Sequence, residues 1–403
     1  MGGGREHPIQ EAARRLRAVL DEPVLSKAVL IVESDDWGPG PDSHARVLED
    51  LGALLKAHRD HRGCHPVVTL GLVLRTPVLD GKGSNLFPSL HWIGFHHEQS
   101  RLLLESLRKG VKEGVFSLQL HGQAHGWEPQ METFLKRCGQ AAGRFFHGGF
   151  LCSELLPPDL QSRWLDTGKG EDSTTCRKNF AEAAYREALS FSRELDRPPT
   201  VAVPPTFIWN DAVEEGWARG GVRVVVTPGK RYASRDAARR PVPDPRRRIH
   251  NGLRNRLGQT YVVRNTYFEP SLGHKAEKVL EALQRDHLAG RPTLVESHRW
   301  NFIRDDETRG RTFRELDRLY RAALNKYGHL VFMTTEELAQ ALTSPHSPLR
   351  ERSLPARLRA ILRRIWQDRI LRAWACLTGL VVPGFLLVKV LEGILDRYEK
   401  RAA

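Results

Sequence analysis

Short apolar segments rich in β-branched residues alternate with longer amphipathic segments along most of the chain. Eight of the apolar segments have the length and composition of buried strands: residues 28–33, 66–73, 115–120, 200–203, 222–227, 260–264, 293–296 and 329–333. Segments of helical period lie among them, at residues 44–58, 98–113, 175–195, 275–289 and 311–327. This alternation predicts an α/β fold, a distorted (β/α) barrel of seven or eight parallel strands, with an open doubly wound sheet as the alternative.

Polar residues follow several of these strands directly. Asp35 and Asp36 come after the first strand, His121 and His125 after the third, and His298 after the seventh. Because the carboxyl ends of barrel strands meet at one rim, we expect these side chains to converge. Two imidazoles and one carboxylate are a common ligand set for a divalent metal ion, which leaves a second carboxylate for proton transfer. Each motif alone also has a plainer interpretation, as a solvated histidine pair or as aspartates that begin a turn or cap a helix.

Taken together, these motifs resemble those of the polysaccharide deacetylases, a family of the glycoside hydrolase/deacetylase barrel superfamily. The resemblance covers residues 25–340 and is strongest to a divergent, poorly characterised branch. It is carried by Asp-Trp-Gly at residues 36–38, His-Gly-x-x-His at residues 121–125 and Ser-His-Arg-x-Asn-Phe-Ile at residues 297–303.

The resemblance implies a metal-dependent hydrolase of non-peptide C–N bonds that deacetylates an N-acylated sugar or glycan, including a lipid-linked one. It implies Asp35 as general base and His298 as general acid. It also implies Asp36, His121 and His125 as ligands of a divalent ion, with Zn²⁺ expected. From the sequence alone, the two aspartates can exchange roles.

The chain departs from the family at the third motif. There, the family places an arginine two residues before a proline to orient the base, whereas this chain has Val203 ahead of Pro205. Arg264 and Arg299 are the candidates to supply the missing charge from another strand.

Aromatic residues near the strand ends suggest a carbohydrate-shaped cleft, because sugar rings stack on aromatic faces. We expect Trp37 and Trp127 near its mouth. Pro205 and Trp209 either contact the substrate or merely end a strand and pack in the barrel wall.

Composition narrows the set of partners and compartments. The chain has 403 residues, 40% of them hydrophobic, which is enough for a sizeable core, and a formal net charge of +14. Basic residues concentrate in 235–248, an Arg- and Pro-rich connection, and in 350–372, without the signature of a nucleic-acid module, so no nucleic acid partner is expected. Five cysteines without paired spacing and a polar amino terminus favour a cytoplasmic location.

The pattern changes after residue 343, which predicts a barrel domain over 1–343 and a helical tail over 344–403. Residues 350–372 alternate arginine with leucine, isoleucine and tryptophan at helical spacing, and residues 373–388 are uncharged but shorter than the roughly 20 residues of a membrane span. The tail is expected either to lie on an anionic membrane surface through residues 350–391, at the inner face, or to pack on the barrel or a second subunit.

Other functions fit parts of this pattern. The same barrel can hydrolyse another C–N bond or a glycosidic bond, or serve as a non-catalytic carbohydrate-binding or membrane-assembly protein. A non-haem iron oxygenase also uses two histidines and one carboxylate, but its customary all-β scaffold does not suit this helix-rich alternation.

Overall fold

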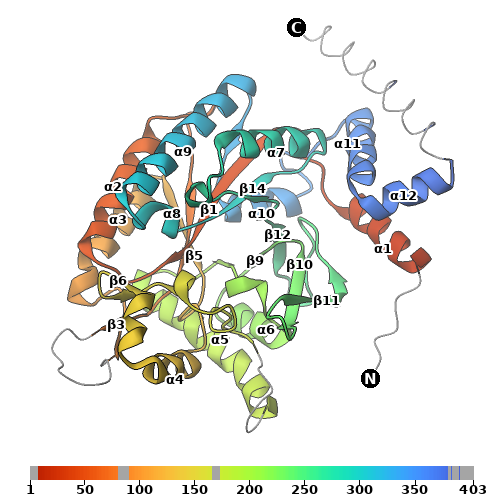
Figure 1. Ribbon diagram of the computed structural model, residues 1–403. Coiled ribbons are helices and arrows are strands. Elements are labelled where there is room, and N and C mark those ends of the chain that lie inside the picture. The colour runs from red at the N-terminus through yellow and green to blue at the C-terminus, as the bar shows by residue number, and fades with distance from the viewer. Residues whose placement is uncertain (1–7, 80–89, 166–172, 380–382, 384–389, 391–403) are drawn as a thin grey trace.

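A curled parallel sheet forms the centre of the molecule, with helices around it (Figure 1). The computed structural model describes residues 8–79, 90–165, 173–379, 383 and 390. Within them, every strand pairing of this sheet is parallel. Its nine strands are β1 (Val29–Trp37), β2 (Val68–Leu72), β5 (Phe116–Leu120), β8 (Val201–Ala202), β9 (Val224–Thr227), β12 (Thr260–Val263), β13 (Thr266–Tyr267), β14 (Thr293–His298) and β15 (Val331–Phe332).

The two edges of this sheet are joined by the chain itself. The strand order is β12-β9-β8-β5-β2-β1-β14-β13, with β15 paired to β1, so β12 and β13 stand at opposite ends of the order. Only Arg264 and Asn265 separate these two strands, and so short a link spans at most about 11 Å. The backbone N–H of Arg264 donates to Thr227 of β9, and that of Asn265 donates to Leu294 of β14. The fold is therefore barrel-like, as the sequence predicts.

Each of the eight predicted strands and five predicted helices coincides with an element of the structure. The predicted helices correspond to α2 (Asp42–Lys56), α3 (Arg101–Lys112), α5 (Ser173–Leu195), α7 (Ala276–Leu288) and α9 (Asp306–Lys326). The remaining helices are α1 (Pro8–Asp21), α4 (Glu128–Cys138), α6 (Asp211–Arg219), α8 (Trp300–Ile303), α10 (Thr335–Thr343), α11 (Leu354–Gln367) and α12 (Arg369–Leu377).

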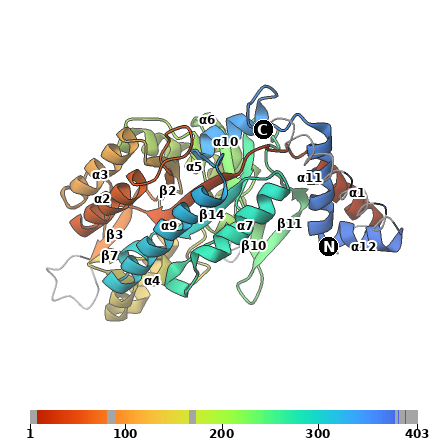
Figure 2. The same cartoon turned by 90° about the horizontal axis from the view of Figure 1, so that it is seen from above.

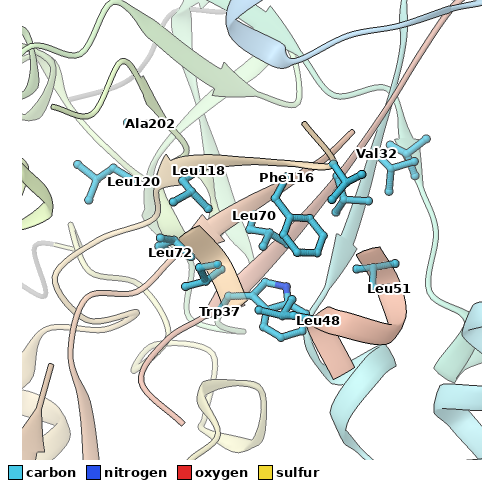
Figure 3. Packing of buried hydrophobic residues seen from close by; sticks show 14 of the residues in the cluster. Val32, Trp37, Leu48, Leu51, Leu70, Leu72, Phe116, Leu118, Leu120 and Ala202 are labelled. Carbon is cyan, nitrogen blue, oxygen red and sulfur yellow. The ribbon is translucent and has the colours of Figure 1, made fainter. Parts of the chain in front are cut away.

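Because side chains alternate between the two faces of each strand, the apolar residues form two separate cores. On β1, Leu30 and Val32 point outward and pack with the residues of α2 and the neighbouring strands that Figure 3 shows, including Leu48, Leu51 and Leu70. The intervening residues of β1 point inward and join a second cluster of mostly β-branched side chains inside the barrel, which contains Val29, Ile31, Val201, Val224, Val226, Val262, Leu294 and Val331. The inner cluster fills the amino-terminal part of the barrel, so polar residues are left for the carboxyl end.

Two small antiparallel sheets lie outside the barrel. One joins β3 (Thr76–Leu79), β4 (Leu90–Ile93), β6 (Phe146–His147) and β7 (Phe150–Leu151), and the other is the hairpin of β10 (Lys230–Arg235) and β11 (Pro241–Arg248). Residues 235–248, which the sequence suggested to be a connection, are therefore largely strand. The three prolines of β11 argued against a strand in the sequence, although proline is tolerated in a strand that pairs on one side only.

The helical tail contacts the barrel and α1. Instead of one helix over residues 350–372, the chain forms α11 and α12, which are separated by Asp368, whose carboxylate caps the amino terminus of α12. Both helices contact α1, and the three lie together at one end of the molecule (Figure 2). Among the described residues, no helix is long and apolar enough to cross a membrane. Half of the apolar run 373–388 lies outside those residues, and the domain boundary at residue 343 stays a prediction.

Arg364 fixes α11 to the barrel. Its guanidinium is 1% exposed and donates to the main-chain carbonyl oxygens of Glu22, Pro23, Ala289 and Gly290 at 2.7–3.0 Å. Burial lowers the pKa of Arg364 to about 10, which still leaves it charged at neutral pH. These carbonyls precede β1 and β14, so α11 is attached at the amino-terminal end of the barrel.

We predict that Arg364→Ala lowers the free energy of unfolding by about 3 kcal/mol, because several buried carbonyl groups lose their donor. Urea denaturation measures this change. Arg357→Ala, on the exposed side of the same helix, should change the free energy by less than about 0.5 kcal/mol. Equal effects of the two substitutions would contradict the anchoring role of Arg364.

Candidate metal centre

Asp36, His121 and His125 meet at the carboxyl end of the barrel. Asp36 is at the end of β1, and the two histidines lie on the loop after β5. Both Nε2 atoms are 3.1 Å from the same oxygen, Oδ1 of Asp36, and one candidate ligand atom from each residue lies within 4.8 Å of the others. All three side chains are buried. The expected convergence of the three predicted metal ligands is thus observed.

The backbone of β1 explains how two consecutive aspartates serve one site. In a regular strand, Asp35 and Asp36 would point to opposite faces. Here Asp36 has a left-handed φ of 71°, and the pairing of β1 with β2 shifts register between Ser34 and Trp37. Such an irregularity redirects a side chain, and aspartate tolerates the left-handed conformation better than most residues. Gly71 on β2 leaves space for Asp35, because a Cβ there would lie 2.3 Å from its Oδ1.

The histidine contacts suit metal binding. Nδ1 of His121 is 2.9 Å from the carbonyl oxygen of Val203. In the neutral imidazole, donation to that carbonyl leaves Nε2 without a proton and free to bind an ion. Asp36 Oδ1 is buried and has no hydrogen-bond partner of acceptable geometry among the described residues, although both imidazoles face it. A buried acceptor in that position is satisfied by a cation. The three residues therefore fit a divalent metal ion.

Electrostatics keep Asp36 ionised. Burial acts to raise the pKa of Asp36, but His125 and His121 outweigh burial and hold that pKa well below its ordinary value. Metal ligation requires the carboxylate form, so the ligand is in the correct state over the physiological pH range.

Arg264 supplies the positive charge that is missing at Val203. Its Nη1 and Nη2 donate to the two oxygens of Asp35, at 2.5 and 2.9 Å, and its Nε donates to Glu33 at 2.5 Å. Burial acts to raise the pKa of Asp35, but Arg264 outweighs burial and holds that pKa below its ordinary value. Of the two arginines considered from the sequence, Arg299 instead lies 3.7 Å from Glu154.

A second pair fixes His298, which lies beside Asp35 in the register of β14 and β1. Its Nδ1 is 2.6 Å from Oε1 of Glu269, and its Nε2 is 4.0 Å from Glu296. Burial acts to lower the pKa of His298, but the bond to Glu269 and the nearby carboxylates raise it to about 10. His298 therefore carries a proton at neutral pH.

These groups surround a cavity of about 450 Å³, within the size range of small-molecule sites. Its lining is rich in carboxylates and imidazoles, and aromatic rings complete its walls. The lining residues are Asp35, Asp36, His121, His125, Glu154, Gln161, Pro204, Thr206, Phe207, Tyr267, Glu269, Ser271, Leu272, Glu296, His298 and Trp300.

The structure corrects the aromatic part of the sequence prediction. Trp37 and Trp209 are each 1% exposed and lie in the hydrophobic core, where their indole nitrogens donate to Ser34 and Glu214. Trp127 packs against the same core and lines a separate groove. Pro205 is buried behind Pro204, which does line the cavity. These large aromatic side chains lie in the core because burial there removes more of their apolar surface from water than a position at the cavity would.

Several cavity residues were missed by sequence reasoning. Glu269 follows β13, a strand of two residues that leaves almost no periodic signal. Tyr267 lies on that same short strand. Glu154 lies on a 3₁₀ turn, Ser153–Leu155, far from any predicted strand. Glu296 lies two residues before His298 in the sequence, which was the available signal for it. Trp300 was noted as an aromatic residue that follows a strand-end motif, and it does line the cavity.

Comparisons with known proteins give remote likenesses only. No family model matches the chain, and no curated protein matches it. Among solved structures, 4-alpha-glucanotransferase from Thermococcus litoralis is 9% identical with a TM-score of 0.38 over 78% of this chain, which covers 40% of that enzyme. A family 4 carbohydrate esterase from Streptomyces lividans in complex with acetate is 10% identical (TM-score 0.34; 77% of this chain and 93% of the esterase). Peptidoglycan deacetylase PdaC from Bacillus subtilis is also 10% identical (TM-score 0.35; 78% and 91%). With values this low, the chemistry of the site rests on its own residues.

We predict that the purified protein binds one divalent ion, and that Asp36→Ala weakens binding of Zn²⁺ or Co²⁺ by more than about 100-fold, since even changes behind the ligands cost 10- to 100-fold. Metal analysis after dialysis and the absorbance of bound Co²⁺ measure this. Asp317→Ala is the matched control, because Asp317 lies 3.0 Å from a single histidine, His58, and binding should be unchanged. Equal metal content in the two variants would refute the assignment.

Proposed function

We propose that the protein is a metal-dependent hydrolase that cleaves a C–N bond, and that its substrate is an N-acylated sugar or glycan. One observation supports this most: the Asp36–His121–His125 cluster shares its cavity with a carboxylate held by Arg264 and a protonated imidazole held by Glu269. Hydrolysis of an amide needs a group that accepts a proton from water and one that donates a proton to the amine.

Asp35 is suited to the role of base. It is ionised because Arg264 lowers its pKa, and it is adjacent to the ligand Asp36 in the chain. A divalent ion bound at the cluster would supply polarisation of the acyl carbonyl and acidification of a water molecule. Asp35 then takes the proton that this water loses. Both its oxygens are fixed by Arg264, so its orientation is set before the substrate arrives.

His298 is suited to the role of acid. Its raised pKa means that it holds a proton throughout the neutral range. An amine is a poor leaving group until its nitrogen is protonated, whereas an alcohol departs more readily. As Asp35 takes a proton from water, the water oxygen bonds to the acyl carbon. The C–N bond then breaks as His298 gives its proton to the nitrogen, so that the amine departs and the acyl group is released as a carboxylate.

The cavity supports a sugar as the rest of the substrate. Tyr267, Trp300 and Phe207 provide ring faces, and Glu154, Gln161 and Ser271 provide hydrogen-bonding groups along the same walls. Apolar faces with a few polar groups between them match the alternating C–H and hydroxyl surfaces of a pyranose ring. Zn²⁺ is the ion we propose, because it accepts two imidazoles and one carboxylate with an open position for water.

We predict that the protein releases acetate from at least one N-acetylated sugar or glycan in a panel assay. Asp35→Asn and His298→Gln should each lower kcat by about 10²- to 10⁴-fold, the usual contribution of general acid–base catalysis. Both variants should keep their metal ion, and Asp317→Asn should keep full activity.

The outcomes separate the alternatives. Acetate release that survives in both variants would refute the roles of Asp35 and His298. A metal-loaded wild type that releases new reducing ends but no acetate would indicate glycosidic hydrolysis. A metal-loaded protein that binds the sugars without turnover would indicate a carbohydrate-binding protein.

We also predict a specific pH effect of Glu269→Gln. In the wild type, the acid should remain protonated until the pH nears 10. Loss of the Glu269 carboxylate should bring the pKa of His298 down, so that kcat falls at a pH at least about one unit lower on the alkaline side. The pH profile of kcat for a neutral substrate measures this. An alkaline limb that does not move in Glu269→Gln would show that Glu269 does not tune the acid.

A further inference from the structure

The helices α1, α11 and α12 form a group at one end of the molecule, and α11 contacts the barrel through an unusual face (Figures 1 and 2). Its buried residues are Ala356, Ala360 and Arg364, which follow one another at intervals of four. A helix normally turns its large apolar residues toward the protein. On α11 the buried row consists of two small residues and an arginine, so the large apolar residues lie elsewhere.

Those residues form a row on the opposite side of α11. Leu354, Leu358, Leu362 and Trp366 are also spaced by four, and at 100° per residue their mean direction points about 180° away from the buried row. Three of the four are exposed, from 37% at Leu358 and 50% at Trp366 to 63% at Leu354, and Leu362 is half-buried. Large apolar side chains on a monomeric surface are usually scattered, whereas the three exposed ones here lie along one side of a single helix.

The neighbouring helix α1 carries a similar row. Ile9, Leu16 and Leu20 occupy positions i, i+7 and i+11 on one side of it, with exposures from 39% at Leu16 to 57% at Ile9. We call these three residues and the four of α11 the apolar stripe. Two helices in contact thus each turn an apolar row outward.

Positive charge borders the stripe. On α11, Arg357 and Arg359 lie on either side of the Leu358 row, and the guanidinium of Arg372 on α12 stacks on Trp366 at 5.9 Å. Residues 354–377 contain six arginines and one aspartate. After residue 377, the sequence continues without a charged residue as far as residue 388.

We propose that the apolar stripe docks on the surface of an anionic lipid bilayer. Leucine and tryptophan side chains enter the region between headgroups and acyl chains, and arginines beside them pair with lipid phosphates. A second copy of the chain is a poorer occupant, because pairing two stripes would bring two rows of arginines together. Negative lipid headgroups are complementary to those same arginines.

The test is flotation of the full-length protein with vesicles. Protein should float with vesicles of phosphatidylglycerol and phosphatidylcholine and remain at the bottom with phosphatidylcholine alone. The double variant Leu358→Gln/Trp366→Gln should reduce the partition coefficient at least about tenfold, because it removes two apolar insertions. Arg357→Gln/Arg359→Gln should reduce it about tenfold at low salt, with a smaller effect at high salt.

Leu189→Gln is the matched control, since Leu189 is a 41% exposed leucine on α5, away from the stripe. It should bind vesicles like the wild type, and all variants should keep the wild-type melting temperature. Three results would overturn the proposal: no flotation of the wild type, equal flotation with neutral vesicles, or unchanged flotation of the stripe variants. A wild-type dimer that the stripe variants convert to monomers would assign the stripe to a second copy instead. Hydrolysis of a soluble substrate by these variants should be unaffected, so this proposal and the proposed function fail independently.

Discussion

The contact between Arg264 and Asp35 connects the closure of the barrel to the chemistry of its rim. Arg264 is one of the two residues that link the edge strands β12 and β13, and its buried guanidinium holds Asp35 and Glu33 together. Glu33 is fixed on its other oxygen by the hydroxyl of Thr335, at the start of α10. Any displacement of the strand edges would therefore move the candidate base. Burying three charges is costly, and the bidentate geometry offsets that cost.

The same rim carries more negative than positive groups. Asp35, Asp36, Glu269 and Glu296 face one cavity, and the protonated His298 and Arg264 neutralise only part of this charge. Burial and the neighbouring carboxylates raise the pKa of Glu296, although Arg264 and His298 act against this. A divalent cation at Asp36 would relieve the remaining repulsion. The convergence of the three ligand atoms beside these carboxylates thus favours a bound cation.

The pattern of residues along the chain was sufficient to predict the barrel. It was not sufficient to predict which charged residues pair with the candidate catalytic residues. Buried strands such as β1, β5 and β14 carry short apolar runs, so their ends, and with them Asp36, His121 and His298, could be located in the sequence. Arg264 was recognised only as one of two candidates, because a charge supplied from a different strand depends on which strands become neighbours. Glu269 was missed, since its position depends on β13, which has two residues. Trp37 was misplaced because a positive φ at Asp36, invisible in the sequence, changes which way the strand end turns.

The position of α11 has a consequence for the substrate. Arg364 attaches this helix to carbonyls that precede β1 and β14, whereas Asp36 and His298 lie at the opposite ends of these strands. Because β1 has nine residues, a rise of about 3.3 Å per residue separates its two ends by roughly 26 Å. A molecule docked through the apolar stripe would hold its cavity away from the bilayer. In that arrangement, an extended glycan or a soluble sugar would reach the metal centre more readily than a sugar attached close to a lipid headgroup.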